Sequence, residues 1–191
     1  MKLTLKEVLQ YHNEGVVQRF LKSWELPREE ALDIFDETKK WLWLCAYVQS
    51  HERGSGRLLI TPSLRMLDEM WHTFILETRD YMKFCERYFG FYIHHKPTPQ
   101  EEHEAQQAEY ERDPQAFLAA HEAMLRPQYE LIYEQLGADT LLKWYSEYLE
   151  RYTDAFMASA WRWSFSPPGA SLRDQLRLPC FPAETSEHEP T

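Results

Sequence analysis

The residues best able to do chemistry in this sequence are its histidines, and one of them is paired with a carboxylate. The sequence holds eight histidines, and the stretch "LDEMWHTF", residues 67–74, places Asp68 and His72 four positions apart. Side chains at that spacing share one face of a helix. The carboxylate can therefore bind a metal ion beside the imidazole, or accept the imidazole N–H and so fix its tautomer. The same pair can instead be a hydrogen-bonded brace on a helix surface, and the spacing leaves both interpretations open.

A second histidine pair lies in "FYIHHKPTP", residues 91–99, which its prolines predict to be an extended loop. Adjacent side chains of an extended segment point to opposite sides, so only one of His94 and His95 can face a given site. Metal sites combine imidazoles with carboxylates. We therefore expect Asp68, His72 and His95 to be candidate ligands of a divalent transition metal (Zn, Fe or Mn), with His94 as the weaker alternative.

The distance between the two histidine segments limits this candidate site. The apolar periodicity over residues 64–89 predicts one unbroken helix that ends at Gly90. His72 would lie roughly 27 Å along the axis from Gly90, and His95 can reach back at most roughly 17 Å. Their Cα atoms then stay about 10 Å apart or more, so the imidazoles meet only if the loop runs back along the helix. If the loop points away, Cys85 is its nearer neighbour. The remaining ligands near His72 would then come from other parts of the chain: His12, His51, His103, His121 or an acid on another helix.

No sequence motif of a known catalytic class accompanies these residues. The sequence contains no HExxH, GxSxG, Walker or GxGxxG pattern. Cys45 lies in an apolar helical segment, where an inert buried thiol is expected rather than a nucleophile. Whether the protein is an enzyme therefore stays open.

The elements that must position these residues are helices, because nearly every periodic segment has helical spacing. The stripe from Ala31 to Val48 has further apolar residues on its other faces, which predicts a central helix buried on most sides. Gly15 is expected to interrupt the first helical stretch, and Pro127 to kink or split a later one. The sequence predicts an all-α, compact bundle of about five to seven helices in a single domain, residues 1–165. Residues 166–191 are Pro-rich and polar, which predicts a disordered tail.

Composition and charge limit the partners of the chain. The 191 residues are 43% hydrophobic and 15% aromatic, which is typical of one globular domain. The net charge of −10 disfavours nucleic acids and anionic membranes, because both attract clustered Lys and Arg. Half of this charge lies in residues 99–113, where six acids and one Arg give −5, as expected of a solvated face. We expect a protein partner to bind this acidic segment or the tail, residues 166–191.

The sequence also predicts a cytoplasmic protein. The N-terminus has no apolar run long enough for a signal peptide, and the longest apolar run is far short of a membrane span. Three cysteines, Cys45, Cys85 and Cys180, form no CxxC pair. Their odd number indicates free thiols in a reducing compartment.

Residues 61–97 carry a series of chemically distinctive residues in a set order. They are Asp68, Trp71, His72, Tyr81, Phe84, Cys85, Gly90 and His95. This order resembles the conserved block of the glycine-rich domain-containing protein family: a D-x-x-W-H element, then Y-x-x-[FD]-C, then a Gly and a His. The resemblance implies a helical domain in which Asp68, His72 and His95 are functional, with Trp71, Tyr81 and Cys85 in support. Phe74 stands where plant members often carry a second His, and the glycine-rich region is absent, so no RNA association is implied.

These observations lead to three hypotheses. The first is a metal-binding helical protein that uses Asp68 and His72 with another His, in hydrolytic or redox chemistry. The second is a non-enzymatic interaction module that presents an aromatic groove or an acidic surface to a protein partner. In the third, Asp68 and His72 are structural, and His72→Ala lowers stability by about 1–2 kcal/mol with no other effect.

Overall fold

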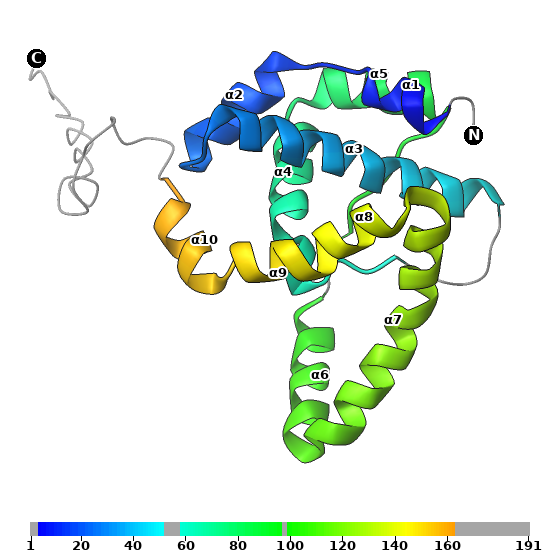
Figure 1. Cartoon of the computed structure of the whole chain (residues 1–191), viewed down its shortest axis with the longest axis vertical. Coiled ribbons are helices and arrows are strands. Elements are labelled where there is room, and N and C mark those ends of the chain that lie inside the picture. Colours follow the sequence, from blue (N-terminus) through cyan, green and yellow to red (C-terminus); the bar gives the residue numbers. More distant parts are fainter. Residues whose placement is uncertain (1–3, 52–57, 97–98, 163–191) are drawn as a thin grey trace, which may run out of the picture.

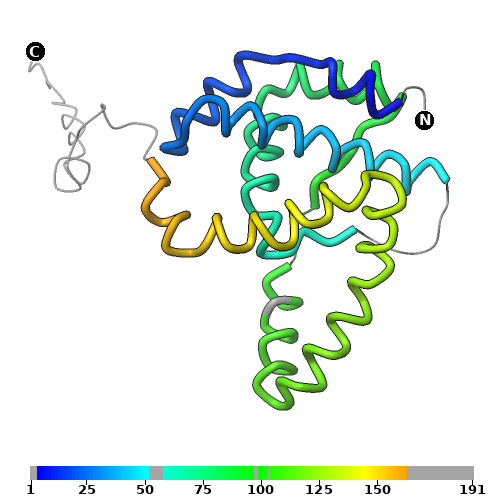
Figure 2. The backbone as a smooth tube through the Cα atoms, viewed as in Figure 1, coloured from blue at the N-terminus to red at the C-terminus, as the bar shows by residue number. Residues whose placement is uncertain are grey.

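The structure is a computed structural model that describes residues 4–51, 58–96 and 99–162, except for the side chain of His103. Every regular element within these residues is a helix, and one isolated bridge joins Trp24 to Trp161 (Figures 1 and 2). The all-α prediction is confirmed. The predicted disordered tail, residues 166–191, lies outside the described residues.

The N-terminal helices are built around one long central helix. They are α1 (Leu5–Leu9), α2 (Glu14–Ser23) and α3 (Arg28–His51). A short non-helical stretch separates α1 from α2. It ends at Asn13, whose side chain accepts a hydrogen bond from the backbone N–H of Val16 at 3.2 Å and so caps α2. The predicted interruption of the first helical stretch lies at residues 10–13 and not at Gly15, which is inside the first turn of α2. The α3 helix contacts α1, α2, α4 and α7, and its buried residues face several sides, as predicted.

The helix predicted over residues 64–89 is divided in two by a corner. A 3-10 turn, η1 (Pro62–Leu64), leads into α4 (Arg65–Leu76), and α5 (Thr78–Tyr88) follows. Glu77 at the corner has φ −81° and ψ 58°, outside the helical region. Its N–H donates to the carbonyl of Phe74, and its own carbonyl accepts from Tyr81. Glu77 therefore ends one helix and begins the next. The unbroken-helix prediction is wrong.

The C-terminal half returns beneath α3 and carries a projecting hairpin (Figure 1). The hairpin consists of α6 (Gln100–Arg112) and α7 (Pro114–Leu136). Pro127 lies inside α7 without splitting it, and Gly137, at φ 87°, ends that helix. The chain continues through α8 (Ala138–Leu142), a π-helical turn η2 (Lys143–Glu147), α9 (Tyr148–Arg151) and α10 (Asp154–Ala160).

A buried carboxylate joins α3 to the π-helical turn. The side chain of Glu37 is 4% exposed and accepts hydrogen bonds from Lys143 at 2.9 Å and from the indole of Trp144 at 2.8 Å. Lys40, on the same helix as Glu37, donates at 2.8 Å to the oxygen that Lys143 also contacts. The charge of Glu37 is thus fully paired, which is the condition under which a buried carboxylate is tolerated.

None of the helices in residues 4–51, 58–96 and 99–162 is both long and apolar enough to cross a bilayer.

Candidate metal centre

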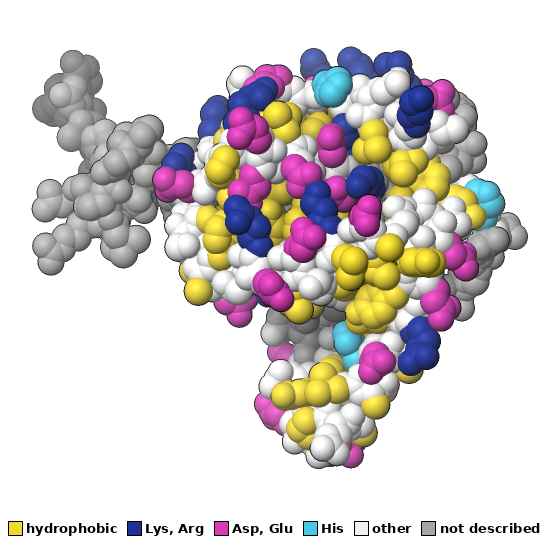
Figure 3. Space-filling model, in the orientation of Figure 1, with side chains coloured by type: hydrophobic (Ala, Val, Ile, Leu, Met, Phe, Trp, Pro, Cys, Tyr) yellow, Lys and Arg dark blue, Asp and Glu magenta, His cyan; other side chains and the backbone are white. Residues whose placement is uncertain are grey.

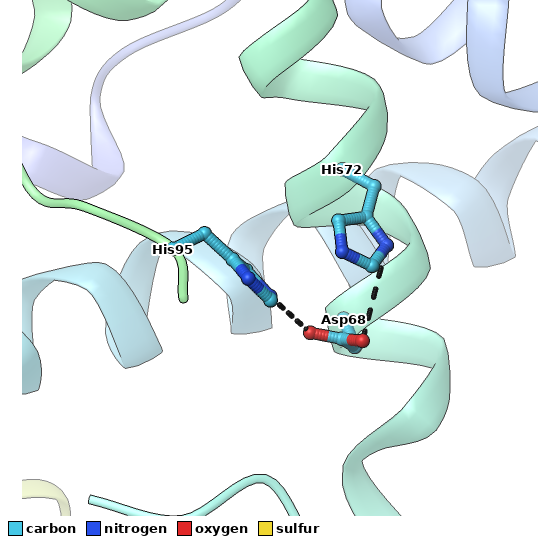
Figure 4. Close-up of side chains that lie close together, drawn as sticks. All are labelled: Asp68, His72 and His95. Carbon is cyan, nitrogen blue, oxygen red and sulfur yellow. Dashed lines mark hydrogen bonds and ion pairs between the residues drawn. The ribbon is translucent and has the colours of Figure 1, made fainter. Parts of the chain in front are cut away.

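Asp68, His72 and His95 lie together, although His95 is 27 residues from Asp68 in sequence. Asp68 and His72 come from successive turns of α4, and His95 comes from the extended segment after α5 (Figure 4). The Nε2 atom of His95 lies 2.7 Å from Oδ1 of Asp68, and Nδ1 of His72 lies 3.8 Å from Oδ2. The two imidazole ring centroids are 4.5 Å apart. One carboxylate therefore faces two imidazoles.

The corner at Glu77 makes this convergence possible. Because α5 turns away from α4, residues 91–96 return along α4 rather than continuing beyond its end. The sequence allowed His72 and His95 to meet only if this segment ran back, and the structure has it do so. The corner also removes the straight-helix geometry on which the distance limit was calculated.

A chain of buried hydrogen bonds holds the returning segment against both helices. The indole N–H of Trp71 on α4 donates to the hydroxyl of Tyr81 on α5 at 2.9 Å. The Tyr81 hydroxyl donates in turn to the backbone carbonyl of Ile93 at 2.8 Å. The ring of Trp71 also packs on His95, with centroids 4.3 Å apart. Trp71 and Tyr81 therefore set the position of His95 through the backbone two residues before it.

Cys85 belongs to this support and not to the ligand group. Burial raises the pKa of its thiol, while hydrogen bonds to the backbone of Ile93 and to Tyr81 lower it. Burial likewise raises the pKa of the Tyr81 hydroxyl. Both groups therefore stay protonated at neutral pH, where they can contribute hydrogen bonds but no anionic ligand.

His94 points away from the site. It is exposed, and its ring packs on Tyr92 with centroids 4.8 Å apart. This is the alternation expected of an extended segment, and it leaves His95 as the inward residue. Among the residues whose side chains the structure describes, Asp68, His72 and His95 are the one group of three His, Cys, Asp or Glu with metal-binding spacing. The structure brings none of the alternative ligands His12, His51 and His121 into it, and the side chain of His103 is outside the described part.

Sequence reasoning missed two neighbours of the site. The carbonyl of Ile93 anchors the returning segment, and its only signal was the in-out alternation of residues 92–95. Glu69 lies beside Asp68 and is close enough to His72 to interact electrostatically with it. Burial raises the pKa of Glu69, and His72 lowers it by a smaller amount. The position of Glu69 in the sequence, directly after Asp68, did not show whether its side chain would be half-buried or fully solvated.

The geometry of the group permits two uses. Its potential ligand atoms all lie within 4.8 Å of one another, and bonds of about 2.0–2.2 Å to one ion would require them to move slightly closer together. The His95–Asp68 hydrogen bond would have to give up its proton, so binding would be coupled to proton release. Without an ion, the 2.7 Å contact between Nε2 of His95 and Oδ1 of Asp68 is a hydrogen bond that the carboxylate accepts. His72 is 48% exposed, so one side of the group faces solvent.

Comparison with known proteins places the site inside a family match. A family model described as UCP032817-like matches residues 11–128, which include Asp68, His72 and His95. No curated protein matches the chain, and no solved structure matches it. The resemblance to the glycine-rich domain-containing protein family is wrong, because the matching family is a different one and its match is far longer. The order of residues that carried the resemblance reflects one local arrangement, a helix corner with a returning segment, and so short an arrangement does not identify a family.

Proposed function

The chain belongs to the UCP032817-like family, and from the side-chain cluster within the matched residues we propose that it binds a divalent transition metal. The proposed ligands are Asp68, His72 and His95. Two imidazoles and one carboxylate form a ligand set suited to Zn²⁺, Fe²⁺ or Mn²⁺, with further coordination positions open. A metal held in this way supplies Lewis acidity and a bound water of lowered pKa.

The observation that carries the proposal is the position of His72. A structural brace between Asp68 and the returning segment needs only the 2.7 Å contact of Asp68 with His95. His72 adds no hydrogen bond to it, since its Nδ1 is 3.8 Å from the carboxylate, yet its ring lies 4.5 Å from that of His95. A metal ion would give His72 a role, as a second imidazole ligand beside the carboxylate.

The support around His95 also favours a ligand site. A ligating histidine is normally held by surrounding packing and hydrogen bonds so that its ring stays in position. Trp71 packs on the ring, and Tyr81 holds the backbone of the same segment. The result is one ligand with 14% side-chain exposure and one, His72, left half-exposed on the solvent side.

Elemental analysis tests the proposal directly. The full chain, purified without a histidine tag, is expected to bind one equivalent of Zn²⁺, Fe²⁺ or Mn²⁺ after incubation with each metal and desalting. His72→Ala and His95→Ala should lose the metal, and His94→Ala, one residue from a ligand, should retain it. Asp68→Asn keeps the size of the side chain and should also weaken binding. If the wild-type chain takes up none of the three metals, the proposal fails.

The same variants separate a metal site from a structural pair. As a surface pair, Asp68 and His72 contribute about 0–1 kcal/mol, so His72→Ala should hardly change the urea midpoint of the metal-free chain. In the presence of metal, the wild-type midpoint should rise and that of His72→Ala should not. A loss of about 1–2 kcal/mol without metal, and no metal effect, would instead identify a structural pair.

A further inference from the structure

A cavity lies where the end of α1 and the turn after it meet the C-terminal end of α5. Its volume of about 560 Å³ is within the size range of small-ligand pockets. Figure 1 shows α1 and α5 at the same edge of the molecule, and Figure 3 shows Lys, Arg and His side chains along that edge. The residues that line the cavity include none of the proposed metal ligands: Glu7, Gln10, Tyr11, His12, Arg87 and Tyr88.

A buried lysine holds the wall that α1 contributes to this cavity. The side chain of Lys39 has 0% exposure, and its ammonium pairs with Asp36 at 2.8 Å. It also donates to the backbone carbonyls of Leu9 at 3.0 Å and Tyr11 at 2.6 Å. The Tyr11 ring packs edge-on against Tyr88, with centroids 6.0 Å apart. The two sides of the cavity are therefore joined and held in place before any ligand arrives.

Two hydrogen-bond donors of α5 reach the cavity without a protein acceptor. Tyr88 is only 4% exposed, yet its hydroxyl bonds no residue in the described part of the chain. This hydroxyl is not enclosed by protein, so it is open to the cavity. Arg87 forms no ion pair with any described residue, and its guanidinium lies over the Tyr88 ring, 5.2 Å from the ring centroid. Together the two donors suit an anionic group of a ligand.

Glu7 brings the opposite charge to the same cavity. Its Oε2 accepts from the backbone N–H of Thr4 at 2.7 Å and from the Thr4 hydroxyl at 2.8 Å. These hydrogen bonds hold the pKa of Glu7 below its usual range, so the carboxylate is ionised at neutral pH. Its other oxygen, Oε1, has no hydrogen-bond donor among the described residues. Glu7 and Arg87 thus line one cavity without pairing with each other, and a ligand can occupy the space between them.

We propose that this cavity binds a small zwitterion, a molecule of the amino-acid class with an ammonium group and a carboxylate on one carbon chain. The guanidinium of Arg87 and the hydroxyl of Tyr88 bind the carboxylate, and Glu7 binds the ammonium group. A simple anion would meet the charge of Glu7, and a simple cation would meet that of Arg87. Only a ligand that carries both charges complements both side chains.

Titrations followed by the amide chemical shifts of the full chain test this proposal. The probes are amino acids of increasing charge separation, from alanine to ε-aminohexanoate, and for each the carboxylic acid and the amine of the same chain length. At least one zwitterion should bind and shift the amides of the cavity residues. Its acid and its amine should bind at least about tenfold more weakly, because each lacks one charged hydrogen-bonding group. The proposal fails if no zwitterion binds, or if the acid alone binds as tightly.

Charge variants locate the binding. Glu7→Gln removes the charge but keeps the cap of α1, since Gln serves as well as Glu at this position of a capping box. Glu7→Gln and Arg87→Gln should each weaken binding of the best zwitterion at least about tenfold. Arg79→Gln is the matched control, because Arg79 is exposed on the same helix and does not line the cavity. Equal binding by the Arg87 and Arg79 variants would overturn the proposal.

Two further variants separate binding from folding and from the metal site. Tyr88→Phe should weaken binding and leave the urea midpoint unchanged, since the hydroxyl that it removes bonds no described residue. Tyr88→Phe binding as tightly as the wild type would remove the hydroxyl from the proposed site. His72→Ala should bind the zwitterion like the wild type, so failure of the metal proposal and failure of this one are distinguishable.

Discussion

Removal of one hydroxyl group, in Tyr81→Phe, should loosen the segment that carries His95. Tyr81 is fully buried, and its hydroxyl accepts from the Trp71 indole and donates to the Ile93 carbonyl. The substitution leaves a buried donor and a buried acceptor without a partner, and each such group costs about 1–3 kcal/mol. Because the aromatic ring stays in place and creates no large cavity, we expect a total loss of about 2–4 kcal/mol in the free energy of unfolding. Urea denaturation of the metal-free chain measures this loss.

The same variant should also weaken metal binding, although Tyr81 touches no proposed ligand. Loss of an outer partner of a ligating histidine typically costs about 10–100-fold in metal affinity. Tyr92→Phe is the control, since Tyr92 packs edge-on against the Tyr81 ring and is 36% exposed. That control should stay within about 0.5 kcal/mol of the wild type. A Tyr81→Phe chain as stable as the Tyr92→Phe chain would refute the role of the Trp71–Tyr81–Ile93 hydrogen bonds. Lower stability with unchanged metal affinity would confine that role to folding.

Three further predictions concern groups away from the site. Burial raises the pKa of Cys45 to about 12, so iodoacetamide at pH 8 should modify it much more slowly in the native chain than in the unfolded chain. Equal labelling rates in the two states, measured by mass spectrometry, would contradict this. Burial also raises the pKa of Tyr145 to about 12. Both groups lose their proton at a lower pH in the unfolded chain than in the folded chain, so high pH favours unfolding. Their contribution to stability is therefore complete below about pH 8 and is lost as the pH rises toward 12. The urea midpoint should therefore fall between pH 8 and pH 11, and a constant midpoint would be inconsistent with these shifts. Glu37→Gln removes a buried charge that faces Lys40, Lys143 and Trp144. It should lower the free energy of unfolding by about 3 kcal/mol, as measured by urea denaturation. Glu147→Gln at an exposed position should cost little, and equal losses in the two variants would show that the network around Glu37 is not stabilising.

The part of the fold that follows from local spacing could be predicted from the sequence. The stripe along α3 repeats over many turns, so its central position was evident before any contact was known. The corner at Glu77 was not predictable in the same way. The buried residues of α5 continue the helical phase of those in α4, and no Gly or Pro marks the break. The corner instead coincides with contacts from distant residues, since Asn13 bonds Asp80, and Arg19 pairs with Glu77.

The candidate site was predictable only as a set of alternatives. Residue types and spacing indicated Asp68, His72 and one of the two adjacent histidines. Which of the two faces inward, His94 or His95, depends on how Ile93 is held, because side chains alternate along the extended segment. The contact of His95 with Asp68 depends in turn on the helix corner at Glu77. The family assignment failed for a related reason: a short ordered set of residues describes a local arrangement, whereas the family match over residues 11–128 covers more than half of the chain.

The π-helical turn η2 restricts how the sequence of this protein can vary. Lys143 and Trp144 are adjacent, and in an α-helix adjacent side chains diverge by about 100°, yet both reach Glu37. Beyond the turn, Tyr148 bonds Asp33, and Tyr152 bonds Glu30. If η2 were wound as an ordinary α-helix with all its residues kept, everything after it would be rotated by about 100° relative to α3. The extra residue of η2 thus lets Lys143 and Trp144 both reach Glu37, while Tyr148 and Tyr152 stay in phase with Asp33 and Glu30 on α3.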